Sequence, residues 1–185
     1  MSDNHHHEEN FIQKYVFSVD HKVIGLQYGV TSLLFLLFGF LLMAVMRYQL
    51  AYPETVIPYI GGWFFSESGG VMLPENYNTL GAMHGTIMIF LGVVPLAVGA
   101  FGNYLVPLQI GAPDMAFPKL NAASYWSYFV GGVIMIASFF TPEGAARSGW
   151  TSYPPLSIFE SGQTMWLLSM IFLITSSLLG SMNII

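Results

Sequence analysis

Long apolar stretches separated by short polar segments are the main pattern in this sequence. Four stretches contain no Asp, Glu, Lys or Arg and cover residues 23–46, 76–113, 120–142 and 161–185. Each is longer than the roughly 20 residues that a helix needs to cross ~30 Å of hydrocarbon. The pattern therefore predicts an all-α fold, a polytopic bundle with transmembrane helices over about residues 23–47, 79–106, 121–141 and 163–185.

The segments between these stretches contain residues that begin and end helices. Asn78 or Thr79 can cap the second span, and Pro107 is expected to end it because proline cannot donate to the helical ladder. In the third span, the pair Gly131-Gly132 is expected to allow close contact with another helix. The connector LQIGAPDMAFPK, after the second span, is predicted to be a tight, structured turn, and the segment from Tyr48 to Asn78 an exposed loop with a partly embedded hairpin.

The N-terminal residues differ in character from the rest. Residues 1–13 are polar and acidic and are predicted to form an arm ahead of the membrane domain, which covers residues 14–185. The run His5-His6-His7 in this arm is a weak metal-site candidate and is more typical of a solvated tail. The final apolar run ends without a cap or a flanking charge, so we expect the chain to be truncated at its C-terminus.

Composition supports a membrane protein. The sequence is 54% hydrophobic and only 8% charged, which is far from the values of a soluble domain. Four spans are too many for a cleaved signal peptide. The absence of cysteine excludes disulfides and thiolate-held metals, but it does not exclude haem held by histidine. Lys14, Lys22 and Lys119 would lie on one side against Arg47 and Arg147 on the other, a split that favours an inside N-terminus.

His84 is the first candidate for chemistry. After Lys22 it is the one ionisable side chain other than tyrosine that lies inside a hydrophobic span. A histidine in a membrane must be hydrogen-bonded, hydrated or ligated to offset its burial. Gly81 and Gly85 leave space beside the ring, which favours ligation of a flat macrocycle. From position alone, a ligand and a histidine that packs against a carbonyl of a neighbouring helix are equally favoured.

Asp114 is the second candidate, a carboxylate in the turn between the second and third spans. Asn103 near the end of one span, with Asn121 and Ser124 at the start of the next, can bring amide and hydroxyl groups toward it. Such a group can take protons from water and pass them along ordered waters. Spacing alone favours the more frequent role of these residue types, which is to cap turns and helices.

Arg47 and Trp150 form a third candidate group. Arg47 closes the first span, and Trp150 lies in the connection after the third. Each alone is typical of an interfacial anchor. Together they can donate hydrogen bonds to polar substituents of a haem on that side of the membrane.

Four motifs then indicate a family. They are FSVDHKVIG, AMHGTIMIF, FGNYLVPLQIGAPDMAFPKLN and GWTSYPPL, and the match runs from about residue 17 to residue 185. In order and spacing they resemble subunit I of the haem–copper oxygen reductases, most of all its A-type cytochrome c oxidases. The resemblance implies the first four helices of a twelve-helix subunit that contains low-spin haem a and a haem a3–copper centre. It implies reduction of oxygen to water, coupled to proton pumping.

The resemblance also assigns roles to individual residues. His84 matches the family's axial ligand of the low-spin haem, and is thus the predicted ligand of the haem iron. Arg47 and Trp150 match residues that contact the formyl group of that haem. Asp114 matches the first carboxylate of the family's D pathway for protons. Four further positions match that pathway: Asn103, Asn121, Ser124 and Tyr28.

Two departures from the family pattern limit what is carried over. Gln49 stands where many relatives place a glutamate of a calcium or sodium site, so the resemblance does not carry that ion to this chain. No charge lies between Lys22 and Arg47, whereas quinol oxidases carry charges there, which favours cytochrome c as electron donor. The second haem a ligand and all ligands of the haem a3–copper centre belong to later helices. We therefore expect this fragment alone to be inactive.

The expected partners are the rest of subunit I, oxidase subunits II and III, and cytochrome c, in a possible respiratory supercomplex. We expect no nucleic acid. The expected location is a bacterial plasma membrane, with the N-terminus cytoplasmic. One alternative is a non-catalytic membrane assembly module in which His84 only packs. Another is a relative of the quinol oxidases or nitric oxide reductases. The neutral first span argues against a quinol oxidase, and the Asp114 turn argues against a nitric oxide reductase.

Overall fold

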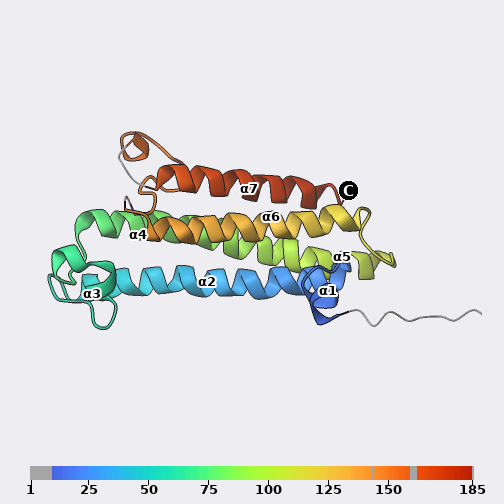
Figure 1. Ribbon diagram of the computed structural model, residues 1–185, viewed down its shortest axis with the longest axis horizontal. Coiled ribbons are helices and arrows are strands. Elements are labelled where there is room, and N and C mark those ends of the chain that lie inside the picture. The colour runs from blue at the N-terminus through green and yellow to red at the C-terminus, as the bar shows by residue number, and fades with distance from the viewer. Residues whose placement is uncertain (1–9, 143, 159–161, 185) are drawn as a thin grey trace, which may run out of the picture.

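The computed structural model describes residues 10–142, 144–158 and 162–184, so His5-His6-His7 and most of the predicted arm lie outside the described residues. Figure 1 shows long helices lying side by side, with the connections gathered at the two ends of the bundle. Within the described ranges the regular structure is helical, apart from one isolated β-bridge between Ala145 and Gly162. The predicted all-α bundle is confirmed.

Among the described residues, four helical segments are long and apolar enough to cross a membrane, and short helices lie at both ends of the bundle (Figure 1). The long segments are α2 (His21–Ala51), Pro74–Ile110, Pro118–Phe140 and α7 (Gln163–Ser181). The second comprises α4 (Pro74–Thr86), η2 (Ile87–Val93), η3 (Pro95–Gly102) and α5 (Asn103–Ile110), and the third comprises α6 (Pro118–Ala137) and η4 (Ser138–Phe140). The short helices are α1 (Phe11–Tyr15), α3 (Gly61–Phe64), η1 (Ser66–Ser68) and η5 (Leu156–Ile158). We refer to the two ends as the α1 end and the α3 end.

Two helix starts have different causes. At α2, the Asp20 carboxylate accepts hydrogen bonds from the backbone N–H groups of Lys22 and Val23, which satisfies donors that have no partner in the first turn. The second long segment begins at Pro74 without a side-chain cap, and a proline at the first helical position has no N–H that needs one. The prediction that Asn78 or Thr79 caps this segment is wrong.

The middle of the second segment, η2 and η3, is wound as a π-helix around Pro95. Pro95 has no N–H to donate into this ladder. In the turn before it, the Leu91 carbonyl oxygen accepts a hydrogen bond from the Tyr128 hydroxyl of α6 at 2.7 Å, and both side chains are fully buried. A side chain of a neighbouring helix thus supports a backbone carbonyl close to the proline, where hydrocarbon surroundings offer no other donor.

Pro107 lies inside the α-helix α5 and has no N–H for the ladder. The carbonyl four residues before it belongs to Asn103, and the buried His21 ring donates to that oxygen from Nδ1 at 2.8 Å. The helix therefore continues through Pro107 to Ile110 and ends at Gly111, whose φ of 72° is suited to glycine. The prediction that Pro107 ends the span is wrong, because sequence alone does not show which side chain of another helix replaces the lost donor.

The Tyr128–Leu91 bond gives a stability prediction. Tyr128→Phe keeps the ring but leaves the Leu91 carbonyl without its donor, so we expect the free energy of unfolding to fall by about 1–3 kcal/mol. Thermal unfolding midpoints of the purified complex with Tyr or Phe at position 128 measure the loss. An unchanged midpoint would contradict it.

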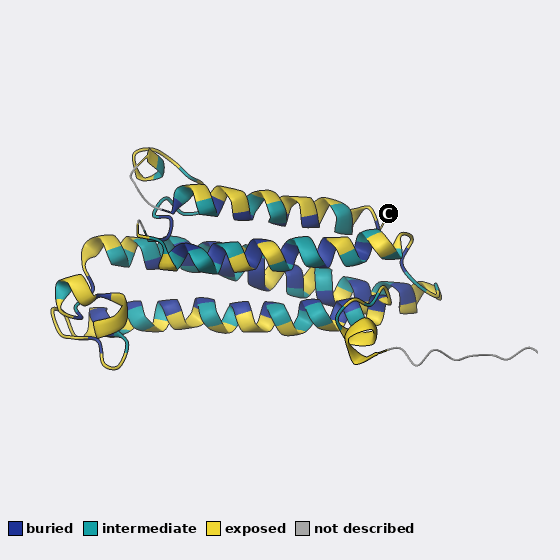
Figure 2. Cartoon of the chain, viewed as in Figure 1, coloured by how far each residue is buried: buried dark blue, intermediate teal, exposed yellow. Residues whose placement is uncertain are grey.

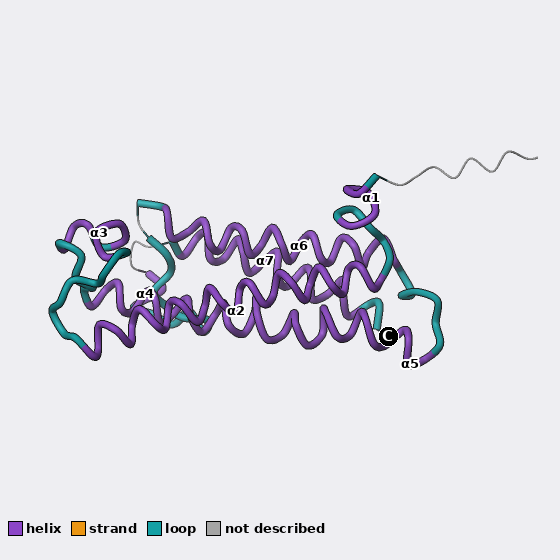
Figure 3. Tube along the Cα trace, turned by 90° about the horizontal axis from the view of Figure 1, so that it is seen from below, coloured by secondary structure: helices purple, strands orange, loops and turns teal. Residues whose placement is uncertain are grey.

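A seam of hydrogen bonds joins α6 to α7. Ser169 and Ser176 of α7, and Asn183 just beyond its end, are spaced seven residues apart, the spacing of one helix face. The Ser169 hydroxyl donates to the Gly131 carbonyl at 2.7 Å, and the Asn183 side-chain oxygen accepts from the Phe117 backbone N–H at 2.8 Å. Between them, the Ser124 hydroxyl donates to the Ser176 carbonyl at 2.8 Å. The two helices are therefore fixed in register along their whole contact, and Figure 3 shows them side by side.

Small residues bring α2 and its neighbours together. A Cβ on Gly132 would overlap the Phe35 ring of α2, and one on Gly99 would lie 2.6 Å from the Tyr28 ring. Gly131 faces the other way, where a Cβ would lie 3.1 Å from the Ser169 carbonyl oxygen of α7. The close contact expected of the glycine pair is thus made with two different helices.

The outward faces of the bundle are apolar. Figure 2 shows buried residues on the inner faces and exposed residues along the outside of α2 and α7. Several exposed side chains are large aliphatics: Leu33, Leu37, Ile171, Ile174 and Leu178. A protein in water rarely exposes so extensive an apolar surface, whereas lipid or further transmembrane helices cover it readily.

Candidate functional site

His84 lies near the end of α4 and faces α2. Its Nδ1 donates a hydrogen bond to the Gly39 carbonyl oxygen at 2.8 Å. Because a carbonyl oxygen only accepts, Nδ1 carries the proton, and a neutral ring keeps its lone pair on Nε2, the atom free to bind a metal. A packing histidine would make the same bond, so the bond alone does not choose between the two roles. The bond does fix the orientation of the ring, as the hydrogen-bond partner of a metal-ligating histidine does.

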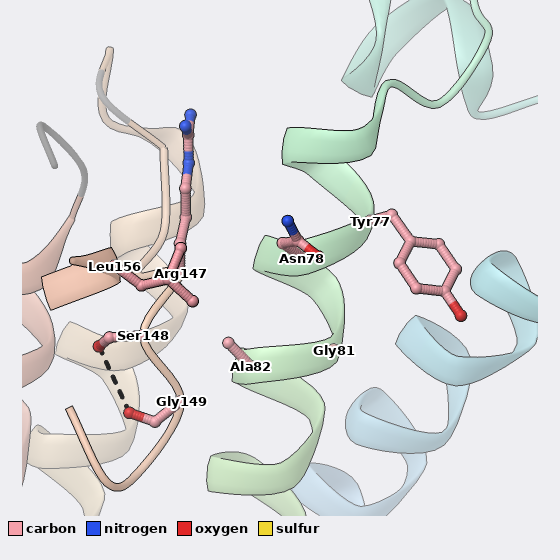
Figure 4. A pocket seen from close by; sticks show the side chains of 8 residues that line it. All are labelled: Tyr77, Asn78, Gly81, Ala82, Arg147, Ser148, Gly149 and Leu156. Carbon is pink, nitrogen blue, oxygen red and sulfur yellow. Dashed lines mark hydrogen bonds between the residues drawn. The ribbon is translucent and has the colours of Figure 1, made fainter. Parts of the chain in front are cut away.

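Open space lies beside His84 on α4. A Cβ on Gly85 would meet no heavy atom within 4 Å, and one on Gly81 would meet only the Met46 terminal methyl, at 3.2 Å. A cleft of about 310 Å³ continues from Gly81 toward the loop that carries Arg147 (Figure 4). One imidazole nitrogen with small residues beside it is a donor set that fits an axially held macrocycle. These residues therefore fit a haem.

Arg47 and Trp150 lie at the same end of the bundle as His84. Arg47 is exposed near the end of α2, and Trp150, in the 144–158 segment, is 56% exposed with its ring centroid 6.2 Å from that of Phe90. Both side chains are thus accessible on the α3 side of the molecule. Their contacts with a haem stay a prediction.

Three hydroxyl groups meet in the buried interior between α2, α6 and α7. The Tyr28 hydroxyl lies 2.8 Å from the Ser124 hydroxyl and 3.2 Å from the Ser176 hydroxyl. All three residues are buried. Each hydroxyl can donate and accept, so the group can pass a proton when the donors reverse direction. The structure brings Tyr28 and Ser124 together and adds Ser176.

Two buried asparagines lie between this cluster and the α1 end. The Asn103 side-chain amide donates to the Gly99 carbonyl at 2.6 Å, while its side-chain oxygen has no partner among the described residues. Asn121 is fully buried, and neither polar atom of its side chain has a described partner. Unpaired buried amides are the groups that buried waters bind. The Asp114 carboxylate, half-buried in the turn, accepts from the Met115 backbone N–H at 2.7 Å.

The sequence reasoning did not identify three functional residues of this region. His21 holds the Asn103 backbone, Ser176 completes the hydroxyl group, and Asn183 fixes the start of α6 through Phe117. Ser176 and Asn183 had a readable signal, since polar residues seven apart in an apolar span share one helix face. His21 had none, because its partner is a backbone atom 82 positions away.

Gln49 organises the connection at the α3 end. Its side-chain nitrogen donates to the Tyr52 carbonyl at 3.1 Å and more weakly to the Thr55 carbonyl at 3.5 Å. Its side-chain oxygen accepts from the Met72 backbone N–H at 3.1 Å. One buried carboxamide therefore joins both ends of the long connection between α2 and α4.

Comparisons with known proteins cover most of the chain. A family profile described as Cytochrome C and Quinol oxidase polypeptide I matches residues 23–185. The chain is 49% identical over 173 residues to cytochrome c oxidase subunit 1 of Thermostichus vulcanus. This match covers 92% of this chain and 28% of that protein. It is 46% identical over 182 residues to cytochrome c oxidase subunit 1 of Synechocystis sp., and this match covers 97% of this chain and 30% of that protein. This chain thus spans less than a third of the length of these curated relatives.

Proposed function

This chain belongs to the cytochrome c and quinol oxidase polypeptide I family, and we propose that it is the first part of the oxygen-reducing subunit of a terminal oxidase. In the proposed enzyme, electrons pass from cytochrome c through low-spin haem a to a haem a3–copper centre, and oxygen is reduced to water. The ligands of that centre lie on the remaining part of the subunit. The observation that carries the proposal is the His84 ring, fixed through Nδ1 with Nε2 directed away from its partner.

His84 is the proposed axial ligand of haem a. The haem, once bound, supplies one-electron transfer at this point of the chain. The Gly39 carbonyl holds the imidazole in the tautomer that can coordinate iron, and it increases the basicity of Nε2. Gly81 and Gly85 leave the side of α4 clear for the macrocycle. Arg47 and Trp150 are proposed to donate to polar haem substituents, which stabilises added electron density.

Asp114 is the proposed proton acceptor from the aqueous phase. Protons would pass from its carboxylate by way of waters held at Asn103 and Asn121 to the hydroxyl group of Tyr28, Ser124 and Ser176. The unpaired buried amide atoms support this route, because ordered waters satisfy such groups and carry protons between them.

The α1 end is proposed to face the cytoplasm of a bacterial cell. The lysines of the first and third spans favour this orientation. Protons would then enter from the cytoplasm at Asp114, while haem a lies toward the outside. The rest of subunit I, subunits II and III, and cytochrome c are the proposed partners.

A reduced-minus-oxidised optical spectrum of the complete complex tests the proposal, together with oxygen uptake from reduced cytochrome c and from quinol. We expect low-spin and high-spin haem bands and uptake from cytochrome c. A complex without haem would leave a membrane assembly module in which His84 only packs. Uptake from quinol alone would indicate the quinol-oxidising branch of the family.

Arg47→Met tests the proposed contact with haem a. Removing a guanidinium that donates to a polar substituent of the ring should shift the low-spin haem band and lower its midpoint potential, since a nearby positive charge favours the reduced form. Arg47→Lys keeps the charge but loses the planar donor, so it should restore the potential better than the band. Spectroelectrochemical titration measures both. An unshifted band and potential in Arg47→Met would refute the contact.

A further inference from the structure

The short helix α1 packs none of its side chains into the bundle. It has no buried residue, and Phe11 is 69% exposed. Figure 2 shows α1 exposed beside the start of α2. A helix of five residues is far below the length at which isolated helices are stable in water. A stable α1 therefore needs a cover on its apolar side.

The side chains of α1 are divided between two faces. Successive residues of a helix are turned by about 100°, so Phe11, Ile12 and Tyr15 share one side. All three are exposed, and Gln13 points to the opposite side. The Lys14 ammonium lies 5.5 Å from the centre of the Tyr15 ring, at the edge of the apolar face. An apolar face with a basic residue beside it is typical of a helix that lies in the plane of a membrane interface.

One side chain of α2 holds the end of α1. The Gln27 side-chain nitrogen donates to the Tyr15 carbonyl at 2.7 Å and to the Val16 carbonyl at 2.9 Å. Carbonyls at the end of a helix have no partner within the helix, so these bonds satisfy them. Directly afterwards, Phe17 stacks on the Trp126 ring of α6, with centroids 5.2 Å apart. The α1 segment is thus attached to two spans, while its apolar face stays uncovered.

The position of Gln27 along α2 places α1 at the edge of the hydrocarbon. With 31 residues, α2 is about 46 Å long, about 16 Å more than the hydrocarbon core. Shared between the two ends, this excess leaves about 8 Å of α2 in each headgroup layer. Gln27 lies about 9 Å along the axis from His21. The end of α1 is therefore held at the level where hydrocarbon meets the headgroups.

We propose that the apolar face of α1, together with Phe17, docks into the phospholipid leaflet at the α1 end, in an orientation set by Gln27. Lipid is the occupant because Leu26 and Val30, the exposed residues of α2 on either side of Gln27, are apolar and belong to the surface that a membrane covers. Headgroup phosphates also carry the charge opposite to Lys14. Docking fixes the depth of the first span in the membrane. This role needs no haem, so its test is independent of the proposed function.

Spin labels on α1 test the proposal in the intact complex, reconstituted in vesicles of phosphatidylcholine and phosphatidylglycerol. This chain has no cysteine, so Phe11→Cys and Gln13→Cys each add one labelling site, and the unsubstituted complex gives the background from other subunits. Collisions with oxygen, which concentrates in lipid, and with a water-soluble nickel chelate give the depth of each label. We expect the label at position 11 to lie about 5–10 Å inside the headgroup phosphates. The label at position 13 should lie on their aqueous side.

Gln27→Leu tests the attachment of α1. Without the two hydrogen bonds α1 is free to turn, so the difference in depth between positions 11 and 13 should disappear. Thr31→Val is the matched control, because Thr31 lies one turn further along α2 and its hydroxyl donates to the Gln27 carbonyl of the same helix. This variant should keep the difference in depth.

Four results would count against the proposal. Equal contact of both labels with the nickel chelate would place α1 in water. Shielding of the position-11 label from both oxygen and the chelate would show that protein covers this face, either a later part of the subunit or another subunit. A difference in depth that persists in Gln27→Leu would overturn the part assigned to Gln27. Its loss in Thr31→Val as well would indicate a general disturbance of α2 and overturn that part too.

Discussion

Replacing His84 with alanine should abolish the low-spin haem signal of the complete oxidase. Loss of only the partner that orients a metal ligand costs about 10–100-fold in affinity or activity, so loss of the ligand itself should exceed about 100-fold. Oxygen uptake from cytochrome c should fall with it, because electrons would have no route to the oxygen-reducing centre. The reduced-minus-oxidised spectrum and the turnover rate measure the two effects. Added imidazole should partly restore the band by entering the space that the side chain leaves.

His21→Ala is the matched control for this experiment. His21 is also a buried histidine that donates from Nδ1 to a backbone carbonyl at 2.8 Å, but it lies at the opposite end of the bundle. Its loss should leave the low-spin band intact. Subunit content of each purified variant shows whether the complex has assembled. An assembled His84→Ala complex that keeps the full low-spin band would reduce His84 to a packing residue.

Asp114→Asn should slow turnover by about 100-fold or more and abolish proton pumping while the haem spectrum stays normal. Proton transfer by a positioned side chain contributes about 10²–10⁴-fold, and an amide can neither take nor release a proton at neutral pH. The turn should persist, because the asparagine side-chain oxygen can still accept from the Met115 backbone N–H. Oxygen uptake and proton release in reconstituted vesicles measure the effect.

Asp20→Asn controls for the loss of a carboxylate on the same side of the bundle. Asp20 caps α2, and asparagine caps helices about as well, so this variant should keep both its fold and its pumping. Normal turnover and pumping in Asp114→Asn would refute its role in proton uptake. A similar loss in both variants would point to surface charge instead of a specific acceptor.

The helices of this fold could be predicted from the sequence, and their interruptions could not. Uncharged apolar runs of sufficient length identify four spans because hydrocarbon admits little else. The same reasoning failed at Pro107, where the chemistry of proline predicted the end of the helix. His21 supplies the missing donor from another helix, so the outcome depends on packing that local sequence does not contain.

The candidate site was predictable in a similar, partial way. A lone histidine in an apolar span indicated His84, and motif resemblance indicated Tyr28 and Ser124. The bond from His84 to the Gly39 carbonyl was not predictable, because a backbone oxygen has no sequence signature. Ser176 could have been found from its spacing with Ser169 on one face of α7, which marks a polar seam inside a membrane helix.

The Gln49 carboxamide affects how this end of the protein responds to changes in external pH and salt. The connection that it joins lies at the α3 end, the end proposed to face the cell's surroundings. An uncharged amide neither titrates nor depends on a bound cation. A carboxylate with a bound cation in its place would titrate, and dissolved ions would compete for its cation site. This face of the protein should therefore keep its shape as external acidity and salinity vary.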